Sequence, residues 1–158
     1  MLLTGDIDAA ITAHPPDCFK QGDPRVARLF PDYRPVEEAY WRETGILPIM
    51  HLIAIRTAAL DGRPWIAMNL FKAFEEAKRA SVARAHEITA SRFPIPWCYD
   101  DAARAGALFG DDYWPYGIEP NRTTLEAFLQ FGFEQGISRS DLTVEDLFAK
   151  EVQTSFRV

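Results

Sequence analysis

Residues 40–56, YWRETGILPIMHLIAIR, join a helix end to an apolar run, and this stretch decides the fold that we expect. The polar, aromatic segment 35–44 is typical of a helix. Gly45 can end that helix, because a residue without a Cβ takes a left-handed cap at no steric cost. Pro48 lacks an amide proton and disfavours helix in the residue before it. The apolar run 49–55 therefore predicts a buried strand that begins at Pro48.

His51 is the titratable group inside this apolar run. An imidazole in such a strand must be hydrogen-bonded or carry a desolvation cost. A backbone carbonyl could satisfy it in the core, and a functional role is an equally good explanation.

The remaining elements follow from hydrophobic periodicity and from glycine and proline positions. They give an α/β fold, helix-rich with a small mixed sheet in which the strand 48–56 is central. Residues 1–158 would form a single domain or a partial fold, without repeats or linkers. The expected elements are a short strand at 7–12, an irregular connection at 14–35 with one helical turn at 25–30, and helices at 64–89, 99–109, 123–136 and 144–148.

The long helix expected at 64–89 has two faces. An apolar face is expected from residues at steps of three, namely Trp65, Met68, Phe71, Phe74 and Ala77. The opposite, solvated face is expected from Lys72, Glu75, Glu76, Lys78 and Arg79. His86, near the end of the helix, is expected at the surface, where it complements the helix dipole.

Composition excludes some classes of function. The net charge of −6, with acidic and basic residues mixed along the chain, argues against a nucleic-acid partner. Cys18 and Cys98 have no metal-type spacing and make no disulfide framework, so we expect a reduced, cytoplasmic protein. The chain shows no membrane-spanning run and no signal peptide at its start, so we expect no membrane insertion.

A second informative stretch is the segment 111–122, DDYWPYGIEPNR. Two prolines and a glycine among three aromatic residues predict a rigid loop. Such a loop could form a ligand wall, because aromatic faces stack on a flat ring, or its rings could simply cover a surface of the fold.

Several segments in collinear order resemble the 4,5-dihydroxyphthalate decarboxylase family. The core of the resemblance is TGILPIMH at 44–51. The other matching segments are GDIDA at 5–9, PPDCF at 15–19, LFPDY at 29–33, WIAMNL at 65–70, KAFEEAK at 72–78 and YWPYGIEPNR at 113–122.

The resemblance implies the C-terminal half of a protein with the two-lobed fold of type II periplasmic substrate-binding proteins. It also implies removal of one carboxylate from 4,5-dihydroxyphthalate, or a related aromatic dicarboxylate, to give 3,4-dihydroxybenzoate and carbon dioxide. No cofactor and no metal are expected, since a phenolate para to the carboxylate can supply the electrons.

Chemistry then suggests roles for individual residues. The reaction needs a proton donor, a partner for the phenol and groups that hold the second carboxylate. We expect His51 to donate the proton and Tyr116 or Glu119 to serve the phenol. Thr44, Gly45, Trp114, Asn121 and Arg122 would bind the small aromatic carboxylate.

Two other hypotheses stay open. The same fold in transport proteins binds small anionic or aromatic ligands without chemistry, as the substrate-binding component of an ABC-type uptake system. A chain with only half of the fold could also be an inactive fragment. It would then expose apolar surface and form a homo-oligomer.

Overall fold

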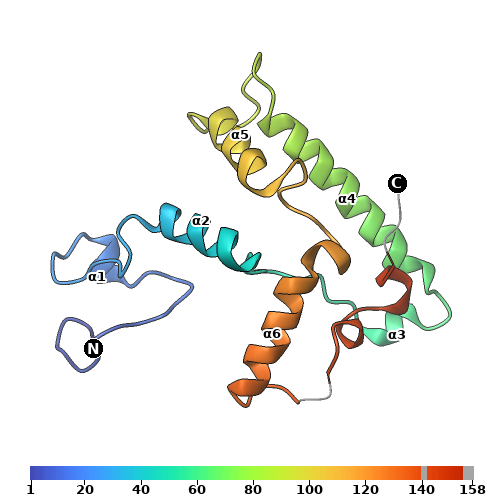
Figure 1. Ribbon diagram of the computed structural model, residues 1–158, viewed down its shortest axis with the longest axis horizontal. Coiled ribbons are helices and arrows are strands. Elements are labelled where there is room, and N and C mark those ends of the chain that lie inside the picture. The colour runs from blue at the N-terminus through green and yellow to red at the C-terminus, as the bar shows by residue number, and fades with distance from the viewer. Residues whose placement is uncertain (140–141, 155–158) are drawn as a thin grey trace. The chain divides into compact units, whose positions relative to one another are not determined.

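The computed structural model describes residues 1–139 and 142–154, and the chain divides into two compact units, Met1–Arg42 and Glu43–Val158. The first unit holds α1 (Asp17–Lys20) and most of α2 (Tyr33–Thr44) (Figure 1). The helices of the second unit are α3 (Thr57–Leu60), α4 (Trp65–Ala85), α5 (Cys98–Phe109) and α6 (Arg122–Glu134). Its short 3₁₀ turns are η1 (Glu119–Asn121), η2 (Glu145–Leu147) and η3 (Lys150–Val152).

The prediction of a helix-rich chain is confirmed, and the prediction of a small mixed sheet is wrong for the described residues. Both expected strands, 7–12 and 48–56, are irregular, and no strand occurs in the part of the chain that the structure describes. A strand depends on hydrogen bonds from a neighbour, and the described chain offers it none. Most of the apolar run, including Met50, Leu52 and Ile53, is exposed rather than buried.

The positions of glycine and proline correctly predicted the end of α2, the beginning of α4 and the end of α5. Helix α2 ends at Thr44, and Gly45 follows with φ of 66°, as the left-handed cap requires. Pro64 precedes the first residue of α4, and Gly110 caps α5 through an amide that donates to the Gly106 carbonyl. The expected helical turn at 25–30 is not helical, and the expected helix at 144–148 is reduced to η2.

Inside the first unit, arginines make local contacts around α1. The Arg28 guanidinium lies 4.9 Å from the ring centre of Tyr33 and 5.8 Å from that of Phe19. Arg25 donates to the Asp23 carboxylate at 2.7 Å, and these hydrogen bonds lower the pKa of Asp23 to about 2.

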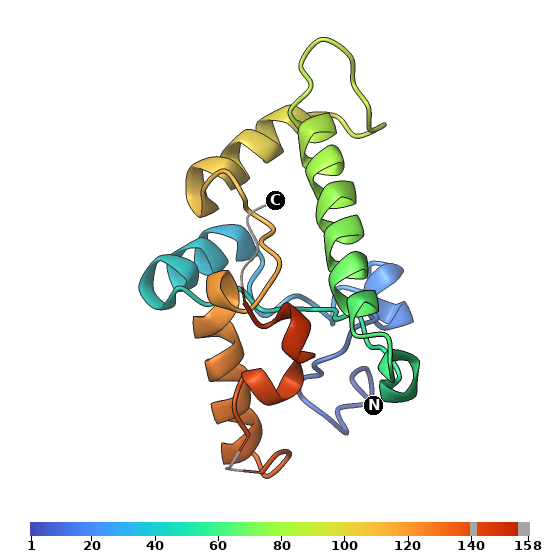
Figure 2. The same cartoon turned by 90° about the vertical axis from the view of Figure 1, so that its right-hand side faces the viewer.

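Helix α4 organises the second unit. It packs against α3 at its beginning, against α5 along its later turns, and against η3 of the C-terminal segment (Figure 1). The small core joins Ile118 of the loop before η1, Leu125 of α6 and Val144 of the C-terminal segment, each less than 5% exposed. Figure 2 shows this C-terminal segment, in red, between α6 and the lower part of α4.

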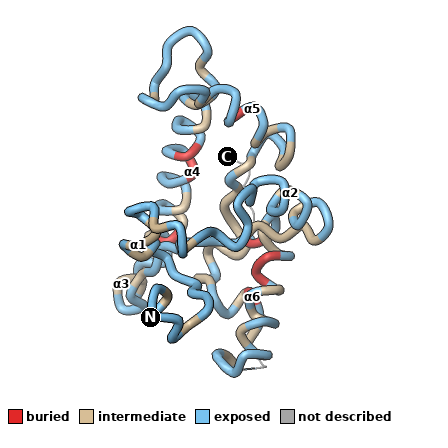
Figure 3. The backbone as a smooth tube through the Cα atoms, turned by 90° about the vertical axis from the view of Figure 1, so that its left-hand side faces the viewer, coloured by how far each residue is buried: buried red, intermediate tan, exposed pale blue. Residues whose placement is uncertain are grey.

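Burial is sparse elsewhere along the described chain. Figure 3 shows short buried stretches in α4, α5 and α6 and mostly exposed backbone between them. Large apolar side chains such as Phe128, Phe131 and Phe133 of α6 are exposed. Among the described helices, none combines the length and apolar character needed to cross a membrane.

Candidate functional site

A groove of about 440 Å³ lies on the second unit between α4 and the loop 110–118. Its walls are mostly aromatic and apolar, and Lys78 is the charged side chain among the described lining residues. The lining consists of Phe74, Ala77, Lys78, Ser81, Val82, Ala85, Phe93, Tyr113, Trp114 and Tyr116. Aromatic walls around one placed charge are typical of sites for small organic ions.

Lys78 is buried although it was expected on the solvated face of α4. Its side chain is 6% exposed, and its Nζ lies 5.0 Å from the ring centre of Tyr116. Lys78 follows Phe74 by four residues and Phe71 by seven, so all three share one helix face. The expected stripe at steps of three drifts away from that face, which is why the prediction was wrong.

Two carboxylates compensate the Lys78 ammonium. Both oxygens of Asp112 accept from Nζ, at 2.9 and 2.8 Å, and Glu75 Oε2 lies 3.0 Å away. Glu75 also accepts from Arg79 Nε at 3.0 Å. These two cations and two anions balance, so the groove wall holds a neutral network in which Glu75 is 12% and Asp112 53% exposed.

The aromatic side of the groove includes Tyr113, which lies beside His86. Burial raises the pKa of the Tyr113 phenol above its ordinary value. The His86 ring lies 5.9 Å from the Tyr113 ring and 6.4 Å from the Tyr99 ring, measured between centroids. His86 therefore contacts the groove wall instead of only complementing the helix dipole.

Two predicted site residues line the groove: Trp114, expected to bind the substrate, and Tyr116, expected to serve the phenol. Asn121, expected to bind the substrate, contacts the loop backbone instead. The Asn121 amide donates to the carbonyls of Pro115 and Gly117, both at 2.9 Å. Gly117 has φ of 95°, a backbone conformation that residues with a side chain rarely adopt, so this turn favours glycine. Asn121 thus shapes the groove through the backbone.

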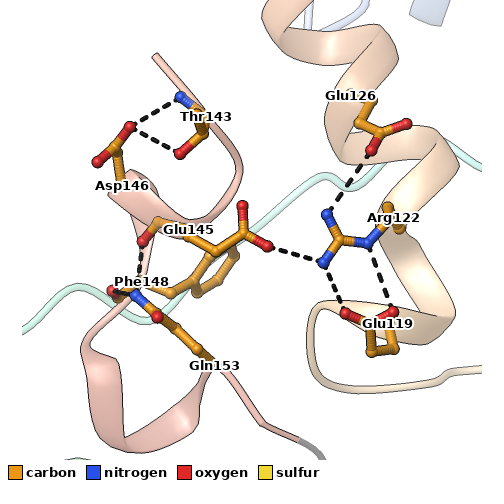
Figure 4. Close-up of polar contacts among 8 residues, drawn as sticks. All are labelled: Glu119, Arg122, Glu126, Thr143, Glu145, Asp146, Phe148 and Gln153. Atoms are coloured by element: carbon orange, nitrogen blue, oxygen red, sulfur yellow. Dashed lines mark hydrogen bonds and ion pairs between the residues drawn. The ribbon is translucent and has the colours of Figure 1, made fainter.

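Glu119 and Arg122 form an ion-pair cluster of their own (Figure 4). Arg122 Nη2 donates to Glu119 at 2.6 Å and to Glu145 at 2.7 Å, and Nη1 lies 3.6 Å from Glu126. These hydrogen bonds lower the pKa of both Glu119 and Glu145 and raise that of Arg122. No side chain makes a capping hydrogen bond at the beginning of α6, whose N-cap residue is Asn121.

Thr44, Gly45 and His51 lie outside the groove lining. The Thr44 hydroxyl accepts from the Ile46 amide at 3.1 Å, and the Leu47 amide donates to the Thr124 hydroxyl of α6 at 3.2 Å. His51 is exposed in the irregular run, and it makes no polar contact with any residue that the structure describes. The described side chains also contain no group of three metal-ligating residues.

Sequence reasoning missed Lys78, which lines the groove, and His86, which lies beside the Tyr113 ring of its wall. Lys78 could have been found by testing the spacing of four and seven from Phe74 and Phe71, which marks a charged residue on an apolar face. His86 carried no comparable signal, because its partners Tyr99 and Tyr113 come from other elements.

A comparison with known proteins finds a decarboxylase to which this chain is similar. The chain is 30% identical over 158 residues to 4,5-dihydroxyphthalate decarboxylase of Comamonas testosteroni. The match covers the whole chain and 48% of that protein, so the chain spans about half the length of its relative. It is a distant, partial homologue of that decarboxylase. No protein-family model matches the chain.

Proposed function

We propose that this chain takes part in the decarboxylation of an aromatic dicarboxylate related to 4,5-dihydroxyphthalate, and that the groove beside α4 holds the ring. The observation that carries the proposal is the placement of buried Lys78 beside Tyr116 in a groove that Trp114 also lines. Stacking on the aromatic side chains would orient a flat ring, and the ammonium would attract its carboxylate. The similarity to the decarboxylase supports the reaction type.

The chemistry requires no external electron carrier. Ionisation of a hydroxyl para to the departing carboxylate pushes an electron pair to the ring carbon that bears this carboxylate. A proton donor adds H⁺ to that carbon, and the C–C bond then breaks. Carbon dioxide leaves, and the bonding pair restores the aromatic ring. The protein must therefore hold the ring, accept the phenol proton and donate one proton to carbon.

Two imidazoles are candidates for the proton donor. His51 lies in the exposed run, and His86 contacts the Tyr113 wall of the groove. Tyr116 lines the groove and could bind the phenol, whereas Glu119 is engaged by Arg122. Variants His51→Ala and His86→Ala assign the donor, because only the variant that removes it should abolish turnover and retain substrate binding.

The test is to incubate the purified protein with 4,5-dihydroxyphthalate and to follow carbon dioxide release and ring absorbance. Turnover that persists with EDTA and is lost in one histidine variant would support the proposal. Saturable binding without carbon dioxide release would contradict decarboxylation and favour a transport-type binding module. Neither binding nor turnover would favour an inactive fragment.

We also propose that the chain self-associates through the exposed apolar run that includes Met50, Leu52 and Ile53. Exposed contiguous apolar surface favours association, because contact between copies removes it from water. Light scattering should give a mass above that of one chain, and the double variant Leu52→Lys, Ile53→Lys should lower it. A monomer at all concentrations would contradict this proposal.

A further inference from the structure

Asp112 occupies the position on Lys78 that a ligand carboxylate would need. Its two oxygens lie 2.9 and 2.8 Å from Nζ, the bidentate arrangement that a free carboxylate would adopt. The same ammonium lies 5.0 Å from the Tyr116 ring centre, at the wall of the groove. An aromatic carboxylate that stacks in the groove would therefore meet Lys78 where Asp112 now sits.

The two carboxylates that compensate Lys78 differ in how readily they can leave. Glu75 is one helical turn away on α4, is 12% exposed and is also held by Arg79. Asp112 is 53% exposed and lies on an irregular loop after Gly110, whose φ is 93°. Departure of Glu75 would break its ion pairs with both Lys78 and Arg79, whereas Asp112 pairs only with Lys78 among these cations and can move into water at small cost.

The charge of the network supports an exchange. Lys78 and Arg79 balance Glu75 and Asp112, so replacing Asp112 by one carboxylate of the ligand keeps the number of carboxylates on Lys78 unchanged. A ligand that bound without displacing Asp112 would add a third anion around the two cations. Like-charge repulsion then disfavours simultaneous occupancy.

We propose that the groove beside α4 binds planar aromatic carboxylates at Lys78, and that Asp112 is a built-in competitor which the ligand displaces. This inference rests on the proposed function for the location of the site and for the ligand class, and it adds a displaceable carboxylate that sets the affinity. Removal of the competitor should tighten binding, whereas removal of an ordinary structural ion pair should weaken it.

The experiment is isothermal titration of the 158-residue protein with phthalate, which lacks the hydroxyls that the proposed decarboxylation needs. Asp112→Ala should bind phthalate about fivefold more tightly than the parent protein, as expected from the loss of a half-exposed ion pair. Asp112→Asn, which keeps the side-chain shape, should also tighten binding and guards against misfolding of the alanine variant.

Asp111→Ala is the matched control. Asp111 is the exposed neighbour of Asp112 and forms no ion pair with the residues that the structure describes. Its removal changes the net charge equally, so its phthalate affinity should stay close to that of the parent. cis-Cyclohexane-1,2-dicarboxylate tests the ring, and it should bind several-fold more weakly than phthalate because it cannot stack.

Several results would overturn the inference. These are unchanged or weaker phthalate binding in both Asp112 variants, equal tightening in Asp111→Ala, equal affinity for the cyclohexane acid, or no phthalate binding by any variant. The two proposals can fail separately. Tighter phthalate binding without turnover of 4,5-dihydroxyphthalate contradicts only decarboxylation, and turnover with unchanged phthalate affinity in the Asp112 variants contradicts only the displacement.

Discussion

The second unit contains two clusters in which one cation meets several carboxylates, and they differ in burial. Lys78 is 6% exposed and borders a groove with aromatic walls. Arg122 is 34% exposed, and its partners Glu119, Glu126 and Glu145 are between 44% and 60% exposed. The Lys78 network is neutral, whereas the Arg122 cluster carries excess negative charge.

This difference shows why ion pairs alone do not indicate a site. Arg122 bridges η1 to the C-terminal segment through Glu119 and Glu145, so its cluster fastens one part of the fold to another (Figure 4). In water such pairs contribute little, because solvent screens them. The buried Lys78 ammonium needs carboxylate partners, and this need suits a site that exchanges one carboxylate for another.

The largest expected effect is on the Lys78 cluster. Lys78→Met should lower the free energy of unfolding by about 3 kcal/mol, because Glu75 would stay buried with only Arg79 as its partner. Urea denaturation followed by circular dichroism measures it. The control is Lys20→Met, which removes an exposed pair with Asp17 and should cost less than about 0.5 kcal/mol. Equal losses of unfolding free energy in the two variants would contradict the claim that burial makes the Lys78 ion pairs more important for stability.

The second largest effect is expected at Asn121, which directly precedes Arg122 in the sequence. Asn121→Asp replaces the amide donor by an acceptor that faces the carbonyls of Pro115 and Gly117, and it should cost about 2 kcal/mol. Thermal unfolding and phthalate titration should show lower stability and weaker binding together. Asn69→Asp, on the exposed side of α4, is the matched control and should change neither measurement appreciably. Unchanged phthalate binding in Asn121→Asp would contradict the idea that the Asn121 hydrogen bonds shape the groove.

Arg122→Met should have a smaller effect on the denaturation midpoint than Lys78→Met, because solvent screens the contacts it removes. Its clearer consequence should be faster limited proteolysis within residues 143–153, since Glu145 would lose its link to η1. Arg63→Met, at an exposed position before α4, provides the comparison. A midpoint shift larger than that of Lys78→Met would reverse the order of the two clusters.

The smallest expected effect is on pH dependence. Hydrogen bonds from Arg122 lower the pKa of Glu119 and Glu145 below their ordinary value of 4.5. Because the pKa of each is lowered on folding, their contribution is present above about pH 4.5 and is lost as pH falls through the folded values. The stability difference between the parent and Arg122→Met should therefore shrink between pH 6 and pH 3. A stability difference that stays constant between pH 6 and pH 3 would contradict the claim that Arg122 stabilises the fold through ionised Glu119 and Glu145.

Local signals in the sequence predicted the helices, because caps at Gly45, Pro64 and Gly110 act within a few residues. The prediction of a strand at 48–56 was wrong, because strand formation depends on a neighbouring strand that the local sequence cannot show. The sequence also indicated an aromatic loop whose Trp114 and Tyr116 line the groove. It could not place Lys78 beside Asp112, since 34 residues separate them along the chain.

The exposed run 49–55 has a consequence for the behaviour of the chain at high concentration. The run is seven residues long, mostly apolar with three isoleucines, and it has no proline and no permanent charge, which is typical of segments that stack into cross-β fibrils. Pro48 and Arg56 flank it directly, and prolines and charges in such positions act as gatekeepers against fibril growth. Colloidal stability of this protein thus depends on two residues that take no part in the groove.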